Sequence, residues 1–194
     1  MNTGSPMRKR NAAATRQAIL DAARRSFAAK SYEHAGLRDI ACEAGVDVAL
    51  IGRYFGNKEK LFREVLRPDE HEEQMLLGKV PQDELPAYFA SLVMDMEHET
   101  SNAQVDRLLI ILRSASSPHT RTIVSEAIEE TIIQPIAGRL DGEDARLRAG
   151  MALSILMGSG ILRKVMGHKA ISEVQDEAIQ KGLTDILEKA LWPN

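Results

Sequence analysis

The sequence is poor in the residues on which disulfide scaffolds and aromatic-lined pockets depend. Its 194 residues include a single cysteine, Cys42, which excludes an intramolecular disulfide and fits a reducing cytoplasm. Only 4% of the residues are aromatic, and most of these precede residue 67. Any ligand pocket farther along the chain must therefore be lined mainly by Leu, Ile, Val and Met.

Long apolar runs and catalytic motifs are also missing. The longest stretch without a charged residue, 149–162, has 14 residues, whereas a membrane helix needs about 20. We expect this stretch to be a helix buried within the protein or between subunits. Residues 1–14 lack the apolar stretch of a signal peptide. We find no nucleophile elbow, metal-ligand pair or phosphate loop, and we predict no catalytic residue, metal site or cofactor.

The charges are distributed unevenly along the chain. The formal net charge is −3, but residues 1–66 hold twelve Lys or Arg and seven Asp or Glu, and therefore carry +5. The remaining residues carry −8. A basic N-terminal part on an acidic body indicates that the N-terminal part meets nucleic acid phosphates.

Two short helices joined by a glycine turn are predicted between residues 37 and 55. Apolar residues at positions 37, 40, 41 and 44 form the stripe of the first helix. Gly45 supplies the left-handed residue that ends this helix, and Asp47 can cap a second helix over 48–54. This pattern is typical of a helix-turn-helix, whose second helix can enter the major groove of DNA.

The rest of the chain is also predicted to be helical. Ser172 and Gln175 have the spacing of a capping box at the start of the last helix. Pro135 should bend the helix that begins at residue 118. We therefore expect an all-α fold of about nine helices, over residues 12–29, 37–44, 48–54, 57–66, 83–99, 102–115, 118–131, 143–166 and 172–191.

Several N-terminal segments resemble the DNA-binding domain of the tetracycline repressor (TetR) family. They are TRQAILDAA (15–23), RDIA (38–41), AGV (44–46) and YF (54–55), together with Phe27, Lys58, Leu61 and Phe62. The resemblance implies a three-helix helix-turn-helix domain over 1–66, with a basic arm at 1–11, and a helical ligand-binding and dimerisation domain over 67–194. It also implies a cytoplasmic protein, associated with the nucleoid when it binds DNA.

The second helix of the motif offers five residues to the DNA groove: Val48, Ala49, Leu50, Gly52 and Arg53. The first three can touch thymine methyl groups or allow close approach. Arg53 is the only long donor, and it either pairs with guanine or contacts a phosphate. Gly52 stands where the family commonly has a large DNA-contacting residue, and Gly36 stands where Ser or Thr usually caps the first helix of the motif.

Further residues are predicted to hold the DNA backbone. The resemblance implies phosphate contacts by Lys58 and by the Tyr54 hydroxyl. Thr15, Arg16 and Arg38 are additional candidates.

The C-terminal part is predicted to hold a ligand pocket and a dimer interface. Adaptable methionines among aliphatic residues favour an apolar small-molecule effector, although methionines at helical spacing also form ordinary core. The predicted pocket comprises Phe89, Met94, Met96, Leu108, Leu112, Met151 and Met157. The family resemblance implies a four-helix bundle between two subunits, built from Leu153, Leu156, Ile161, Leu162, Val165, Ile179, Leu183 and Ile186.

The sequence therefore predicts a transcriptional regulator that binds double-stranded DNA. The favoured hypothesis is a homodimeric, ligand-responsive repressor that binds a near-palindromic operator. The alternative is an activator, or a regulator that answers to a protein partner. An enzyme is the third class, which the scattered carboxylates do not favour.

Overall fold

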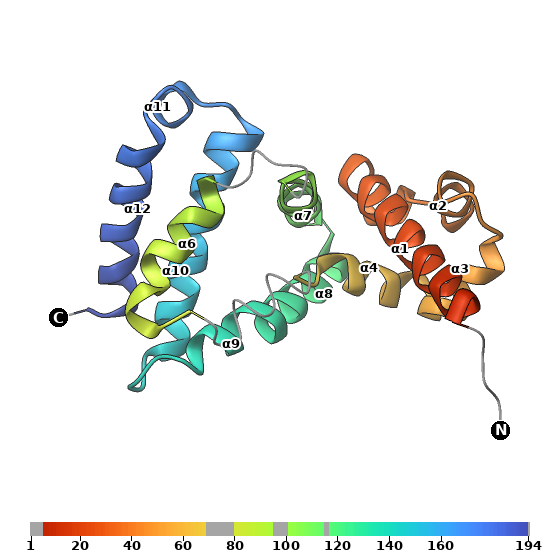
Figure 1. The fold of residues 1–194 in the computed structure, drawn as a ribbon, viewed down its shortest axis with the longest axis horizontal. Coiled ribbons are helices and arrows are strands. Elements are labelled where there is room, and N and C mark those ends of the chain that lie inside the picture. Colours follow the sequence, from red (N-terminus) through yellow and green to blue (C-terminus); the bar gives the residue numbers. More distant parts are fainter. Residues whose placement is uncertain (1–5, 69–79, 95–100, 115–116, 194) are drawn as a thin grey trace. The chain divides into compact units, whose positions relative to one another are not determined.

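The computed structural model describes residues 6–68, 80–94, 101–114 and 117–193. The described residues form helices and contain no strand, as the all-α prediction required. Figure 1 shows these helices along the chain. In chain order they are α1 (Pro6–Ala29), α2 (Leu37–Glu43), α3 (Val48–Phe55), α4 (Lys58–Leu66), α6 (Leu85–Met94), α7 (Ser101–Ser114), α8 (Pro118–Ile128), α9 (Gln134–Ala137), α10 (Ala145–Gly160), α11 (Lys169–Ser172) and α12 (Asp176–Leu191).

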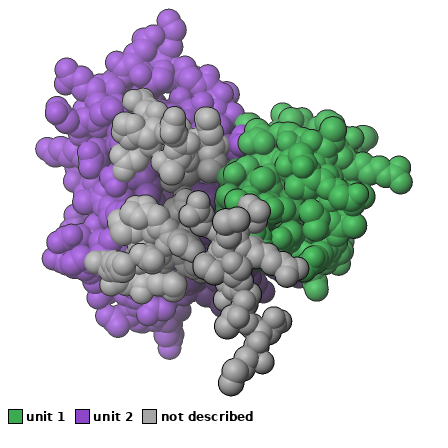
Figure 2. Space-filling view, turned by 45° about the vertical axis from the view of Figure 1, so that its right-hand side comes forward, with its two compact units in different colours: residues 1–66, 109–124 green, residues 67–108, 125–194 purple. Residues whose placement is uncertain are grey.

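The chain divides into two compact units, which Figure 2 distinguishes by colour. Unit 1 comprises residues 1–66 and 109–124, and unit 2 comprises residues 67–108 and 125–194. The sequence had placed residues 109–124 in the C-terminal domain. In the structure the end of α7 and the start of α8 belong to unit 1, because they contact N-terminal residues such as Tyr32, which the His119 ring meets.

The core of unit 1 joins α1, α2, α3 and α4. Ile19, Ile40, Ile51 and Leu61 are each fully buried there. Phe62 on α4 meets Phe27 on α1 edge to face, with 4.9 Å between ring centroids. Burying side chains of this size contributes roughly 1.5–3 kcal/mol each, so these contacts fix how the four helices pack.

The core of unit 2 is built mainly from α6, α10 and α12. Leu85 and Phe89 on α6 pack with Leu187 and Leu191 on α12, and all four are almost completely buried. The side of α10 that faces this core carries small residues, among them Ala149 and Ala152. Small residues let the three helices approach closely.

Helix α10 continues into a π-helical turn, η5 (Ile161–Val165). By length and composition alone this 21-residue segment could cross a membrane. It packs against α6 and α12 of the same chain, but only 22% of its most apolar stretch is buried. On the other side of α10, Leu147 and Met151 are exposed in the part of the chain that the structure describes.

Two helix boundaries depart clearly from the prediction. Helix α1 begins at Pro6, so residues 6–11 of the expected arm are helical, while residues 1–5 lie outside the described part. The expected end near Thr131 is replaced by a π-helical turn, η4 (Glu129–Ile133), in which the Gln134 amide donates to the Glu129 carbonyl five residues before it. The wider turn precedes Pro135, which has no N–H to donate.

The predicted capping box is wrong. Ser172 ends the short helix α11 and its hydroxyl donates to the Gly167 carbonyl, 3.2 Å away. Gln175 precedes α12 without a side-chain cap. The spacing of a capping box is present, but the Ser172 hydroxyl bonds to the Gly167 carbonyl, which lies just after η5.

Arg148 is a buried cation that fastens the end of α12. Its guanidinium donates to the Leu191 carbonyl at 2.6 Å and also to the Asp141 carbonyl, and the residue is 9% exposed. A cation at the C-terminal end of a helix is favoured by the helix dipole. Arg148 thus holds α12 on α10.

Replacing Arg148 by Met should lower the free energy of unfolding by about 3 kcal/mol, because two buried carbonyls lose their donors. Chemical denaturation at fixed protein concentration measures this loss. Arg146→Ala is the matched control: Arg146 also lies on α10 but is exposed, with a surface ion pair to Glu129. Equal effects of the two substitutions would contradict the role given to Arg148.

Candidate DNA-binding site

The turn between α2 and α3 is set by backbone hydrogen bonds around one glycine. Gly45 has φ of 67°, the left-handed region that ends helices. The Val46 amide donates to the Ala41 carbonyl at 2.9 Å, and the Gly45 amide donates to the Cys42 carbonyl at 3.1 Å. This pair of bonds is a Schellman motif, and it turns the chain sharply out of α2.

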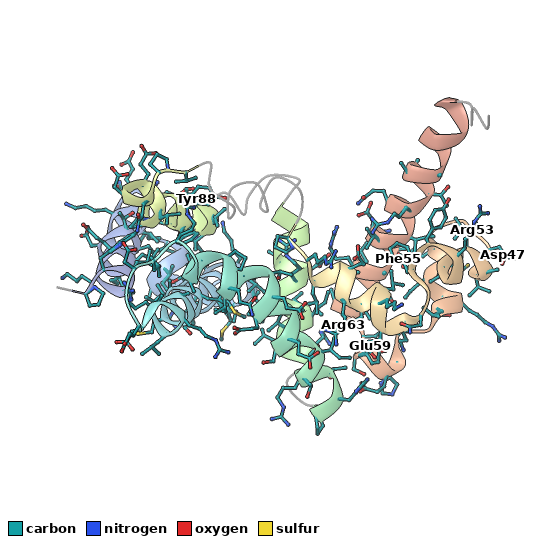
Figure 3. All side chains as sticks on the ribbon, turned by 90° about the horizontal axis from the view of Figure 1, so that it is seen from below. Asp47, Arg53, Phe55, Glu59, Arg63 and Tyr88 are labelled. Atoms are coloured by element: carbon teal, nitrogen blue, oxygen red, sulfur yellow. The ribbon has the colours of Figure 1, made fainter. Side chains whose placement is uncertain are left out.

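Helix α3 starts directly after this turn. The Asp47 carboxylate accepts a hydrogen bond from the Ala49 amide at 2.8 Å, as the sequence predicted for a cap. Ile51 is fully buried and Phe55 is 6% exposed, so one face of α3 packs on its own unit. Figure 3 shows Asp47 and Arg53 at the outer edge of α3, with Phe55 directed toward α1.

The opposite face of α3 is uncovered. Val48 is 40% exposed, and Ala49, Gly52 and Arg53 are exposed as well. Leu50 is only partly exposed. Arg53 has no hydrogen bond or ion pair within the described part of the chain. The structure thus brings the predicted groove residues onto one face, with Arg53 as the only cation among them.

The two glycines that depart from the family pattern differ in their surroundings. A Cβ at Gly52 would meet nothing within 4 Å, so the surface there is open. Gly36 precedes α2 without a side-chain cap, and a Cβ there would lie 3.3 Å from a carboxylate oxygen of Asp39. Because glycine has no side chain, positions 36 and 52 offer no polar side-chain group to DNA.

Arg16 ties three helices together. Its guanidinium lies 2.5 Å from a carboxylate oxygen of Glu64 on α4 and 5.0 Å from the centre of the Phe55 ring on α3. Because Arg16 lies on α1, the group links α1, α3 and α4. This predicted phosphate contact already has two partners in the protein, and these hold the C-terminal end of α3.

Lys58 is also held within unit 1. Its ammonium lies 4.6 Å from the centre of the Tyr32 ring, and it donates a long hydrogen bond of 3.5 Å to the Glu33 carbonyl. Partial burial lowers the pKa of Lys58, and the negative charge of Glu33 opposes that shift. Lys58 is the first residue of α4, and two residues of η1 (Tyr32–His34) thus hold its ammonium group in place.

The remaining backbone candidates vary in exposure. Arg38 on α2 is exposed, while Thr15 on α1 and Tyr54 on α3 are only partly exposed. Tyr54 stays next to Phe55, with ring centroids 6.5 Å apart.

The predicted pocket residues do not share one environment. Phe89 is in the core of unit 2, and Met94 packs against that core. Leu108 is buried and Met157 is partly buried, whereas Leu112 is 44% and Met151 is 50% exposed. Met151 falls on the outer side of α10, away from Ala149 and Ala152. Leu112 belongs to unit 1, and Met96 lies outside the described residues.

The predicted interface residues also divide into two groups. Leu153, Leu156 and Ile179 pack against the core of unit 2, and Leu183 is 8% exposed. Leu162 and Ile186 are 37% and 53% exposed, and Ile161 and Val165 are partly exposed. Leu147 and Met166, which the interface prediction did not include, are more exposed than either. Their spacing from Met151 and Leu162 along α10 was the available signal.

Several solved structures resemble the chain. NalD of Pseudomonas aeruginosa, the secondary repressor of the MexAB-OprM multidrug efflux pump, has a TM-score of 0.63 and 20% identity over 93% of this chain and 96% of NalD. A TetR-like regulator from Rhodococcus sp. RHA1 has a TM-score of 0.60 and 16% identity over 93% and 97%. The multidrug binding protein EbrR, complexed with malachite green, has 0.59 and 18% over 91% and 98%.

The similarity to these structures concerns the fold. A search of curated protein sequences gave no match. Two family models match the chain directly. Residues 19–65 match the model of bacterial regulatory proteins of the tetR family, and residues 83–191 match the tetracyclin repressor-like C-terminal domain. Together they cover the helix-turn-helix and most of unit 2. The chain therefore belongs to the TetR family and is a DNA-binding transcriptional regulator.

Proposed function

We propose that the protein is a homodimeric repressor that binds a near-palindromic operator and releases it when an apolar small molecule binds to unit 2. The observation that carries this proposal is the uncovered face of α3. Its residues are left open in the single chain, and Arg53 is the one cation on it. A major groove supplies both acceptors for a guanidinium and methyl groups for apolar side chains.

Dimerisation is supported by a second uncovered surface, on α10 and α12. The residues on the outer side of α10 recur every three or four positions and are exposed or nearly so: Leu147, Met151, Ser154, Gly158, Leu162 and Met166. On α12, Ile186 is exposed, and Gly182 precedes it by one helical turn. Open space around Gly158 and Gly182 allows helices of a second copy to approach closely. One helix-turn-helix alone reads too little DNA for tight specific binding.

Ligand response is supported by the composition of unit 2. Its described core is built from aliphatic residues with Phe89 as the fully buried aromatic side chain, which suits an apolar molecule. NalD and EbrR are named as a repressor of a multidrug efflux pump and as a multidrug binding protein. We infer that the effector here is likewise a hydrophobic compound, bound by Phe89 and Met94 among the predicted residues.

One experiment tests the whole proposal. Genomic fragments bound by the purified protein are selected, and release of the recovered operator is then measured with malachite green and with a neutral aliphatic probe such as decanol. Release by either probe supports a ligand-responsive regulator. An operator that overlaps the promoter supports repression, and one upstream of the promoter favours an activator. In a separate assay, turnover of a substrate that is abolished by one substitution would support the enzyme hypothesis instead.

Arg53→Ala should weaken binding to the selected operator by about 1–3 kcal/mol, because a bidentate contact to guanine is lost. Binding to random DNA should change much less. Fluorescence anisotropy with both duplexes measures the difference. An equal loss on the two duplexes would reassign Arg53 to a phosphate.

Lys58→Ala should weaken binding to the operator and to random DNA alike, since a phosphate contact carries no sequence information. The slope of log affinity against log salt concentration should fall by about one for each contact that is lost. Salt titrations of the two duplexes supply the measurement. Lys60→Ala is the control, because Lys60 is an exposed lysine on the same helix.

Ile186→Arg should separate the two subunits and abolish tight operator binding, because a charge enters an apolar contact. Asp185→Arg, at the exposed neighbouring position, adds the same side chain away from that surface and should leave the dimer intact. Sedimentation equilibrium gives the mass of each variant. A dimer that persists in Ile186→Arg would place the interface elsewhere. A natural protein that dissolves and dimerises only in detergent would favour a membrane role for α10.

A further inference from the structure

The first turn of α8 is fastened to the DNA-binding unit at η1. The pKa of Glu33 on η1 is lowered, first by a hydrogen bond from its own backbone and then by one from the Ser117 side chain. The His119 ring lies 6.0 Å from the Tyr32 ring, at an angle of 64°. Two consecutive residues of η1 thus contact Ser117, which directly precedes α8, and His119 in its first turn.

The first turn of α8 is held by several hydrogen bonds. Thr120 is 1% exposed, and its hydroxyl lies 3.1 Å from the Ser114 carbonyl at the end of α7 and 3.2 Å from the Ser117 carbonyl. The Arg121 amide donates to the Ser117 carbonyl at 2.9 Å. The buried threonine therefore ties the first turn of α8 to Ser114 at the end of α7 and to Ser117.

The same two residues of η1 hold Lys58. Tyr32 offers its ring and Glu33 its carbonyl to the ammonium, so Lys58 contacts both residues that α8 contacts. Tyr32 also packs against Phe62, with ring centroids 5.0 Å apart. Burial, Glu59 and Glu33 raise the pKa of Tyr32, which keeps its hydroxyl protonated.

We propose that Tyr32 and Glu33 are positioning residues for the phosphate contact of Lys58, and that the first turn of α8 sets their position through His119 and Ser117. This inference rests on the proposed function, which makes Lys58 a phosphate contact. A lysine held over a ring loses less side-chain freedom when a phosphate arrives. Movement of the start of α8 would thereby change the DNA affinity through one lysine.

A double-mutant cycle on the full chain tests the positioning role. The probe is a random-sequence duplex at low ionic strength, since a phosphate contact needs no operator. Tyr32→Leu should weaken binding about two- to five-fold in the natural background and leave it unchanged in Lys58→Ala. Tyr32→Phe keeps the ring and should bind like the natural protein. Thermal unfolding of each variant shows that unit 1 is folded.

A second set of variants tests the role of Ser117 and His119 and leaves Tyr32, Phe27 and Phe62 unchanged. Ser117→Ala combined with His119→Ala should weaken binding about two-fold, again only when Lys58 is present. Thr122→Ala is the matched control, because Thr122 is exposed on α8 and its hydroxyl bonds to the Pro118 carbonyl of the same helix. It should have no effect on DNA affinity.

The outcomes separate this inference from the proposed function. Equal losses in the presence and absence of Lys58 would make Tyr32 and α8 ordinary structural supports and would overturn the inference alone. Tighter binding by Tyr32→Leu would overturn it as well, since the ring would then restrain the lysine from DNA. No effect of Lys58→Ala on affinity or salt slope would overturn both the phosphate contact and the inference built on it.

Discussion

The reading of DNA by this protein depends on how the two ends of α3 are fastened. At the first end, the left-handed Gly45 and the Asp47 cap leave the chain one way to pass from α2 into α3. At the second end, Arg16 joins Phe55 to Glu64 and so fixes α3 against α1 and α4. The short helix needs both, because eight residues do not form a stable helix alone in water.

Unit 2 depends on a different device, namely buried arginines within an apolar helix. Arg148 binds carbonyls, while Arg163 binds the Asp176 carboxylate and the Ile171 carbonyl. Because these cations lie inside, they fix α10 against the segments that lead into and out of α12. The outer side of α10 can then remain apolar and smooth, with small residues at Ser154 and Gly158, as close association of two copies requires.

The local features of the fold could be predicted from the sequence, and the long-range ones could not. Gly45 and Asp47 act through neighbours in the chain, so their roles follow from spacing. The pair of Arg16 and Glu64 joins residues 48 apart, and no local pattern relates them. Ser172 shows the opposite failure: its local pattern was correct for a cap, but the fold gave its hydroxyl another partner.

The candidate site shows the same division. The face of α3 followed from helical periodicity, whereas the surroundings of Lys58 depend on η1 and on the start of α8, which the fold brings together. Met151, which the sequence predicted to line a ligand pocket, is half exposed on α10. An apolar residue on a helix has the same sequence signature whether it faces a ligand, a core or a second subunit.

The central claim is that two chains, joined through α10 and α12, present two copies of α3 to one operator. Sedimentation equilibrium of the protein with the selected operator duplex tests this most directly. The account predicts a complex of two chains, or a multiple of two, for each duplex, with no bound single chain at any ratio. A single chain that binds the duplex with the full affinity and specificity would contradict it.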